Sequence, residues 1–136
     1  MFATSVADEP LSYAAHFGEA GLMFDQKQYG TAEREIHIAL RLYDGDPRAY
    51  MNLGSLYEKA GHCDAAMPLA RRALELEPYF VMARLMIARC LEKAGDYRAL
   101  RSVAIEGLAD GIQTKLYREV LFTADSGVRA AATGQH

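Results

Sequence analysis

Apolar side chains recur three or four positions apart along most of the chain, with polar residues between them. Leu53 and Tyr57 show this spacing in the middle of the chain, and Leu116 and Val120 show it near the end. Such a period places the apolar residues on one face of a helix. Together with capping signals, it predicts seven helices, over residues 11–25, 30–43, 47–60, 64–76, 81–94, 98–110 and 113–124. The predicted fold class is all-α, in keeping with the abundance of Ala, Leu, Glu and Arg.

The sequence Glu-Lys-Ala-Gly occurs twice, ending at Gly61 and at Gly95, and the two copies lie 34 residues apart. Shifting the chain against itself by this interval superposes three sets of residues: Ala32, Ala66 and Leu100; Ala39, Ala73 and Gly107; Lys27, Gly61 and Gly95. A fixed period of this length indicates stacked helical repeats. Glycine readily adopts the left-handed conformation that ends a helix, so Gly61 and Gly95 are predicted to form turns.

The middle copy carries the most specific motif, which begins at Pro47 and ends at Pro78. Between these prolines stand Tyr50, Leu53, Gly54, Tyr57, Ala66, Ala70 and Ala73. The arrangement resembles the tetratricopeptide repeat, W-x2-L-G-x2-Y followed by A-x3-F and P, with Tyr in place of Trp and Ala in place of Phe. His16 and Arg84 occupy the position of Tyr50 in the first and third copies.

The resemblance covers residues 13–112 and implies a right-handed α-solenoid of helix-turn-helix hairpins. Three repeats are expected, at 13–46, 47–80 and 81–112. They form a single domain over 11–124, in which a capping helix at 113–124 covers the last repeat. Residues 1–10 are expected to be an N-terminal extension, and residues 125–136 a mobile tail without periodicity.

Two local features support the hairpins. The small residues Gly54, Ala66 and Ala73 are expected where paired helices cross closely, because larger side chains would push the helices apart. Asp46 followed by Pro47 is typical of a helix start, with aspartate as the N-cap and proline at the first helical position.

In this family the first helix of each hairpin lines a concave groove that holds a peptide. The corresponding positions here are Phe17, Phe24, Arg48, Met51, Asn52, Ser55, Met82, Leu85, Met86 and Arg89. The resemblance therefore implies a partly apolar, Met-rich peptide-binding groove, and methionine adapts well to varied apolar ligands. The alternative is that neighbouring helices or the N-terminal segment cover Met82 and Met86.

The co-chaperone members of the family hold a C-terminal carboxylate in a clamp of Lys, Asn and Arg side chains. The positions that match this clamp carry Phe17, Gly21, Asn52, Met82 and Met86. Only Asn52 fits, and a carboxylate would be buried there without a cation. We therefore expect no carboxylate clamp.

Composition narrows the choice of partner and compartment. The formal net charge of −3 offers no concentrated basic surface, so a nucleic-acid partner is not expected. No apolar run is long enough to span a membrane, and no basic segment precedes an apolar one at the N-terminus, so we expect a cytoplasmic protein without membrane contact. Cys63 and Cys90 form no CxxC motif and are expected to be free, mostly buried thiols. The alternative is a disulfide between them.

Motifs of catalysis are missing from the sequence. It contains no P-loop, HExxH, GxSxG or dinucleotide fingerprint, and its four histidines are scattered. His16 is expected to pack between helices rather than act as a base. We predict a protein that is not an enzyme and uses no cofactor or metal.

The function predicted from these features is a non-catalytic protein–protein interaction scaffold. Such an adaptor would bind a peptide or helix of a protein partner in its groove. A more specific version is a chaperone-like role in a bacterial secretion or envelope-assembly system. The alternative is a self-associating structural module that forms a homodimer, a larger homo-oligomer or part of an assembly.

Overall fold

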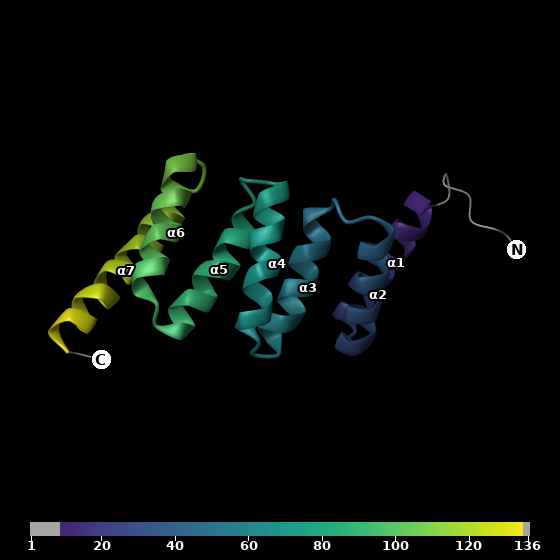
Figure 1. Cartoon of the computed structure of the whole chain (residues 1–136), viewed down its shortest axis with the longest axis horizontal. Helices are drawn as coiled ribbons and strands as arrows, with labels where there is room; N and C mark the ends of the chain where they lie inside the picture. The colour runs from purple at the N-terminus through teal and green to yellow at the C-terminus, as the bar shows by residue number, and fades with distance from the viewer. Residues whose placement is uncertain (1–8, 135–136) are drawn as a thin grey trace, which may run out of the picture. The chain divides into compact units, whose positions relative to one another are not determined.

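The computed structural model describes residues 9–134, with side chains from Ser12 onward. In this range it contains seven helices and no strand: α1 (Glu9–Asp25), α2 (Tyr29–Leu42), α3 (Pro47–Lys59), α4 (Cys63–Leu76), α5 (Val81–Ala94), α6 (Tyr97–Asp110) and α7 (Thr114–Thr133) (Figure 1). The all-α fold of repeated helical hairpins predicted from the sequence is confirmed. The predicted helix ends agree with the structure within two residues, except for the end of the last helix.

The helices form two compact units, one ending at Leu76 and the other beginning at Glu77. In the first unit, α1 packs against α2, and α3 packs against α4. The core of this unit consists of Ala20, Ala32, Ile36, Leu53 and Leu56, with Met23, Phe24, Leu40, Tyr57 and Leu69 against it. In the second unit, α6 lies between α5 and α7 and packs against both. Ile87, Leu91, Leu100 and Tyr117 are buried there.

Small residues sit where the paired helices meet, as the period predicted. Ala66 and Ala73 are completely buried, as are Ala32 and Ala39 of the preceding repeat. Gly107, which aligns with Ala39 and Ala73, faces the ring of Tyr117 on α7, and a Cβ atom added to it would lie 2.6 Å from that ring. Close approach of the helices therefore depends on the absence of side-chain volume at these positions.

The predicted turn residues have the expected backbone conformation. Gly61 and Gly95 have φ values of 83° and 73°, and Lys27, their counterpart in the first repeat, has a φ of 62°. A positive φ is uncommon for a residue with a side chain, so the turn geometry prevails over local preference at Lys27. Asp46 caps α3 as predicted, and its carboxylate accepts a hydrogen bond of 2.9 Å from the backbone N–H of Arg48.

The end of the chain differs from the prediction. Helix α7 continues to Thr133, nine residues beyond the predicted end at 124, so the expectation of an aperiodic tail from 125 is wrong for residues 125–133. Gly127 of α7 lies against Tyr97 of α6, and Asp125 accepts a hydrogen bond of 2.9 Å from Arg101. The second half of α7 is thus held by α6. Of the expected extension 1–10, residues 1–8 lie outside the described residues, and the last two already belong to α1.

Neither Cys63 nor Cys90 is a free thiol, so the expectation of two free thiols is wrong.

Among the described helices, none is long and apolar enough to cross a membrane.

Candidate functional site

The first unit brings several predicted groove residues together between α1 and α3. Phe24 on α1, and Asn52 and Ser55 on α3, line one hollow of about 290 Å³. Its remaining walls are Ala20, Gly21, Asp25 and Ile36. We call this the α1–α3 hollow. Its lining combines apolar surface with a side-chain amide, a hydroxyl and the carboxylate of Asp25, which suits a peptide that buries a side chain and hydrogen-bonds through its backbone.

Gly21 keeps the α1–α3 hollow open. A Cβ atom added to Gly21 would meet no other atom within 4 Å, apart from its own helix and chain neighbours. The ammonium of Lys59 lies 5.5 Å from the ring centroid of Phe24, and the ring of Tyr29 contacts Phe24 edge-on at 5.5 Å. These contacts fix the orientation of Phe24, so the wall that it provides is ordered before any ligand arrives.

An aromatic and ionic cluster lies near the start of α3. The Arg48 guanidinium donates to both carboxylate oxygens of Asp46, over 3.0 Å from Nε and 2.7 Å from Nη2, and stacks 4.9 Å from the Phe17 ring centroid. The hydroxyl of Tyr13 donates to Asp46 over 2.7 Å, and its ring stacks on Phe17 at 5.7 Å. Phe17 and Arg48 are therefore neighbours, as the predicted groove requires, and the charge of Arg48 is already matched by Asp46.

This cluster changes the ionisation of two of its members. Burial and the hydrogen bond to Asp46 raise the pKa of the Tyr13 hydroxyl well above its usual range. Burial also pushes the pKa of Asp46 upward, but the hydrogen bonds from Arg48 and Tyr13 outweigh it and hold that pKa below its usual value. Asp46 is thus a buried carboxylate that stays charged, and it ties α1 to the start of α3.

The three methionines predicted for the groove have different surroundings. Met86 is completely buried and Met51 is 7% exposed, so both are core residues, and their assignment to an accessible groove is wrong. Met82 is 54% exposed and is available to a ligand. The sequence pattern placed all three on the first helices of hairpins, but the burial of each depends on which neighbouring helix faces it.

The second unit contains another hollow, which we call the α5–α7 cleft. It has a volume of about 170 Å³ and is lined by Leu85, Ala88, Arg89 and Glu92 of α5, Leu100 of α6, and Leu116, Glu119, Val120 and Thr123 of α7. Leu85 and Arg89 were predicted groove residues. The four α7 residues were missed because that helix was interpreted only as a cap. Their spacing along α7 matches the spacing of groove residues on α3 and could have indicated the second wall.

A buried arginine joins the helices of the second unit. The guanidinium of Arg84 on α5 donates to the carboxylate of Asp110 at the end of α6 and lies 5.9 Å from the ring centroid of Tyr117 on α7. Arg84 stands at the repeat position of Tyr50 and His16, where an apolar side chain is usual. It therefore has a structural role, linking three helices around Gly107.

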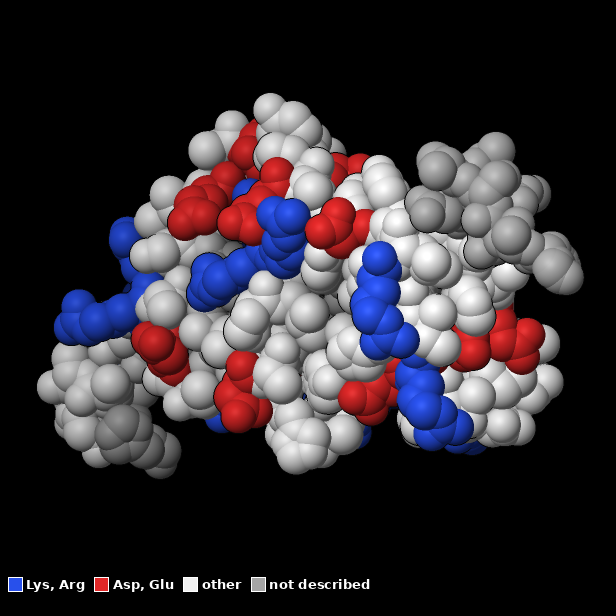
Figure 2. Space-filling model, turned by 45° about the vertical axis from the view of Figure 1, so that its right-hand side comes forward, with Lys and Arg blue, Asp and Glu red and all other residues white. Residues whose placement is uncertain are grey.

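In the described part of the chain, a close contact between a histidine and a glutamate joins two helices. His16 Nδ1 lies 2.7 Å from Glu35 Oε2, an interhelical contact between α1 and α2 as predicted. No group of three or more His, Cys, Asp or Glu residues within residues 9–134 could hold a metal ion. Figure 2 shows basic and acidic side chains interspersed over the face that it draws, without a field of one sign.

Comparison with known proteins identifies the repeat. The family model described as "Tetratricopeptide repeat" matches residues 47–90, the copy with the clearest motif. The yeast Sti1 TPR2B domain in its pHsp70 complex superposes with a TM-score of 0.72 at 16% identity, over 85% of this chain and 98% of that one. Residues 47–90 are a tetratricopeptide repeat, and the chain has the fold of a tetratricopeptide-repeat domain.

Two further relatives show how broad this tetratricopeptide-repeat similarity is. The Yersinia enterocolitica type III secretion chaperone SycD, in complex with a peptide of the translocator YopD, has a TM-score of 0.69 at 16% identity, over 89% of this chain and 92% of that one. The human RANBP2-like and GRIP domain-containing protein 1 is 37% identical over 59 residues, which are 43% of this chain. The aligned part is only 3% of that relative's length, so the similarity concerns the repeats and not the whole relative. At such identities the two solved structures establish a shared fold.

Proposed function

We propose that this protein is a non-catalytic scaffold that binds a peptide or helical segment of a protein partner. The observation that carries the proposal is the α1–α3 hollow, where Phe24, Asn52 and Ser55 converge around the space left by Gly21. An apolar wall with a few polar groups, already formed in the free protein, is typical of a binding site for a side chain and its backbone. The pHsp70 and YopD complexes of the structural neighbours support this kind of partner.

The proposed ligand does not depend on a free C-terminal carboxylate. Phe17 and Gly21 on α1 stand where the carboxylate clamp of the family needs a Lys and an Asn, and the nearby Arg48 is already paired with Asp46. A carboxylate in the hollow would face the amide of Asn52 without an unpaired cation in its lining. The absence of a clamp remains a prediction, and an internal segment of the partner is the proposed ligand.

A chaperone-like role is the more specific form of the proposal. The similarity to SycD, a secretion chaperone in complex with a peptide of the translocator YopD, supports this form. A role in bacterial secretion or envelope assembly, and a cytoplasmic location, stay predictions from the sequence.

The test is to fill the α1–α3 hollow. Gly21→Leu adds a side chain where the structure leaves space, and leucine favours a helix more than glycine does. A peptide selected from a displayed random library on the wild-type protein is then measured by fluorescence polarisation. We expect Gly21→Leu to weaken its binding by at least about tenfold while the melting temperature is kept or raised. Gly18→Leu, one turn away on the same helix and outside the hollow, is the matched control.

Self-association is the second candidate function, favoured by exposed apolar side chains on the second unit. Phe122 is 71% exposed and Met82 is 54% exposed. Light scattering across a concentration series distinguishes the two functions. A mass that doubles with concentration, together with a library that yields no binding peptide, would replace the scaffold proposal by a homodimer.

A further inference from the structure

The α5–α7 cleft has an apolar floor. Leu85 and Ala88 of α5, Leu116 and Val120 of α7, and the buried Leu100 of α6 all line it. An apolar cavity of about 150 Å³ in a protein accepts a molecule the size of benzene. The cleft, at about 170 Å³, therefore has room for one apolar side chain.

Both rims of the cleft carry an acidic side chain. Glu92 stands on α5 and Glu119 on α7, and both are exposed. Neither glutamate has an ion-pair partner among the residues that the structure describes. Arg89 also lines the cleft, but it already has a partner of its own. The charge that the cleft offers to a ligand is therefore negative.

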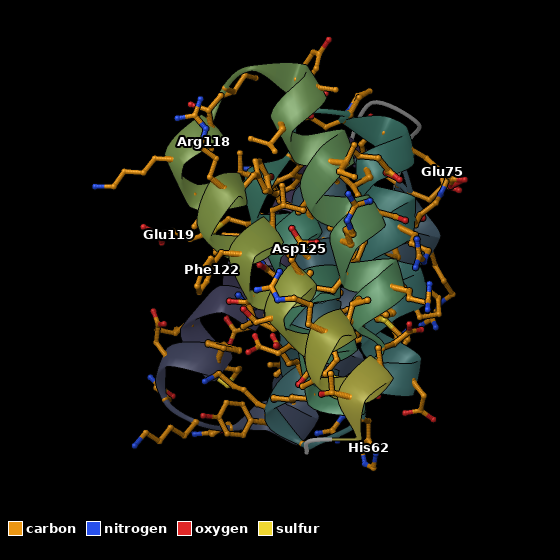
Figure 3. The ribbon with its side chains drawn as sticks, turned by 90° about the vertical axis from the view of Figure 1, so that its left-hand side faces the viewer. His62, Glu75, Arg118, Glu119, Phe122 and Asp125 are labelled. Carbon is orange, nitrogen blue, oxygen red and sulfur yellow. The ribbon has the colours of Figure 1, made fainter. Side chains whose placement is uncertain are left out.

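An exposed aromatic ring adjoins the acidic rim. Glu119 and Phe122 project from the same side of α7, away from α6 (Figure 3). Phe122 is the most exposed large apolar side chain in the described part of the chain, at 71%. Four other aromatic rings of the protein hold a cation at 4.9–5.9 Å, and Phe122 is not among them. A ring beside a carboxylate is a favourable place for a Lys or Arg side chain.

We propose that the α5–α7 cleft binds a basic, amphipathic segment of a partner protein. One apolar side chain of this segment enters the cleft between Leu85 and Leu116. Flanking Lys or Arg side chains pair with Glu92 and Glu119, and one of them stacks on Phe122. An acidic segment would be repelled from both rims, which is the reason for choosing a basic one. The inference rests on the proposed scaffold function and adds the chemical class of the ligand for the second unit.

The experiment uses two short synthetic peptides, both fluorescein-labelled and amidated at the C-terminus. One has a central leucine flanked by arginines, and the other has glutamates in place of the arginines. Fluorescence polarisation with the full chain is measured at low and at physiological salt. We expect the basic peptide to bind more tightly than the acidic one, and added salt to weaken this binding. Tighter or equal binding of the acidic peptide would overturn the proposal.

Charge reversal on the rims locates the site. Glu119→Lys and Glu92→Lys should each weaken the binding of the basic peptide by at least about fivefold. Phe122→Ala should weaken this binding as well. Glu106→Lys makes the same change on an exposed position of α6 outside the cleft, and it should leave the affinity unchanged. All four positions are exposed, so circular dichroism melts should stay close to that of the wild type. Equal losses from Glu106→Lys and Glu119→Lys would show binding to net charge alone and would sink the proposal.

A failure here can be told apart from a failure of the proposed scaffold function. If library-selected peptides bind the wild type, lose affinity with Gly21→Leu and are indifferent to Glu119→Lys, the scaffold function stands and the basic-segment inference is wrong. If no peptide binds and the protein dimerises, both are wrong. A basic peptide that loses affinity with Glu119→Lys but not with Gly21→Leu supports the second-unit site on its own.

Discussion

The ring of Tyr117 packs so closely on Gly107 that a Cβ atom at position 107 would lie 2.6 Å from it. Tyr117 is almost completely buried, and its ring lies beside the guanidinium of Arg84, so it has no free space into which to move. This contact joins α6 to α7.

We therefore expect Gly107→Ala to lower the free energy of unfolding by about 1–3 kcal/mol, because overpacking forces a shift of the ring or the helix. Chemical denaturation followed by circular dichroism measures the effect. Gly18→Ala is the matched control, since a Cβ atom there meets nothing within 4 Å. It should stabilise the protein by about 0.5–1 kcal/mol through helix propensity. Equal effects at the two glycines would contradict the packing at Gly107.

We expect the aromatic and ionic cluster around Asp46 to lose its stabilising effect in acid. The pKa of Asp46 is held below its usual value, so the unfolded state takes up a proton more readily than the folded state does. The stability from this carboxylate is complete above the unfolded pKa of about 3.9 and is lost as the pH falls from there through the folded pKa. Asp46→Asn keeps an N-cap side chain but removes the charge, so its stability should depend less steeply on pH in this window than that of the wild type.

Denaturation curves at a series of pH values measure this dependence. Asp44→Asn, an exposed position two residues earlier, serves as the control and should retain the wild-type slope. An unchanged slope in Asp46→Asn would mean that another group causes the acid sensitivity.

The second half of α7 gives a prediction that separates a packed helix from a mobile tail. A Cβ atom on Gly127 would lie 2.2 Å from the ring of Tyr97. In a mobile segment Gly127→Ala would have no cost, whereas in this helix it should destabilise by about 1–3 kcal/mol. In a Tyr97→Ala background the cost should largely disappear, and the double-mutant cycle measures this coupling. Additive effects would show that the two residues do not touch.

Two methionines one turn apart on α5 test the border between surface and core. Met82 is 54% exposed and Met86 is completely buried. Met82→Glu should therefore leave the melting temperature nearly unchanged. Met86→Glu would bury an unpaired charge, which we expect to cost about 3 kcal/mol or more and to unfold the second unit. Thermal melts of the two variants give the answer, and a stable Met86→Glu protein would contradict the burial of that side chain.

Much of the fold follows from the sequence, for a local reason. The interval of 34 residues sets where each hairpin begins and turns, and it identified the left-handed turns at Gly61 and Gly95 and the position equivalent to them at Lys27. The cap at Asp46 is equally local, because it involves a side chain and the N–H two residues away. Part of the candidate site follows as well, since repeat positions placed Phe24, Asn52 and Ser55 on facing helices.

Only the tertiary structure decided the features that depend on a neighbour distant in sequence. Residues 125–133 lack an apolar period, and they are helical because Gly127 and Asp125 find Tyr97 and Arg101 on α6. Repeat position alone does not separate Met86 from Met82, since one is covered by other helices and the other is not. The acidic α5–α7 cleft has the same origin. Its two walls are far apart in the chain, and only the packing of both helices on α6 places Glu92 and Glu119 at the rims of one cleft.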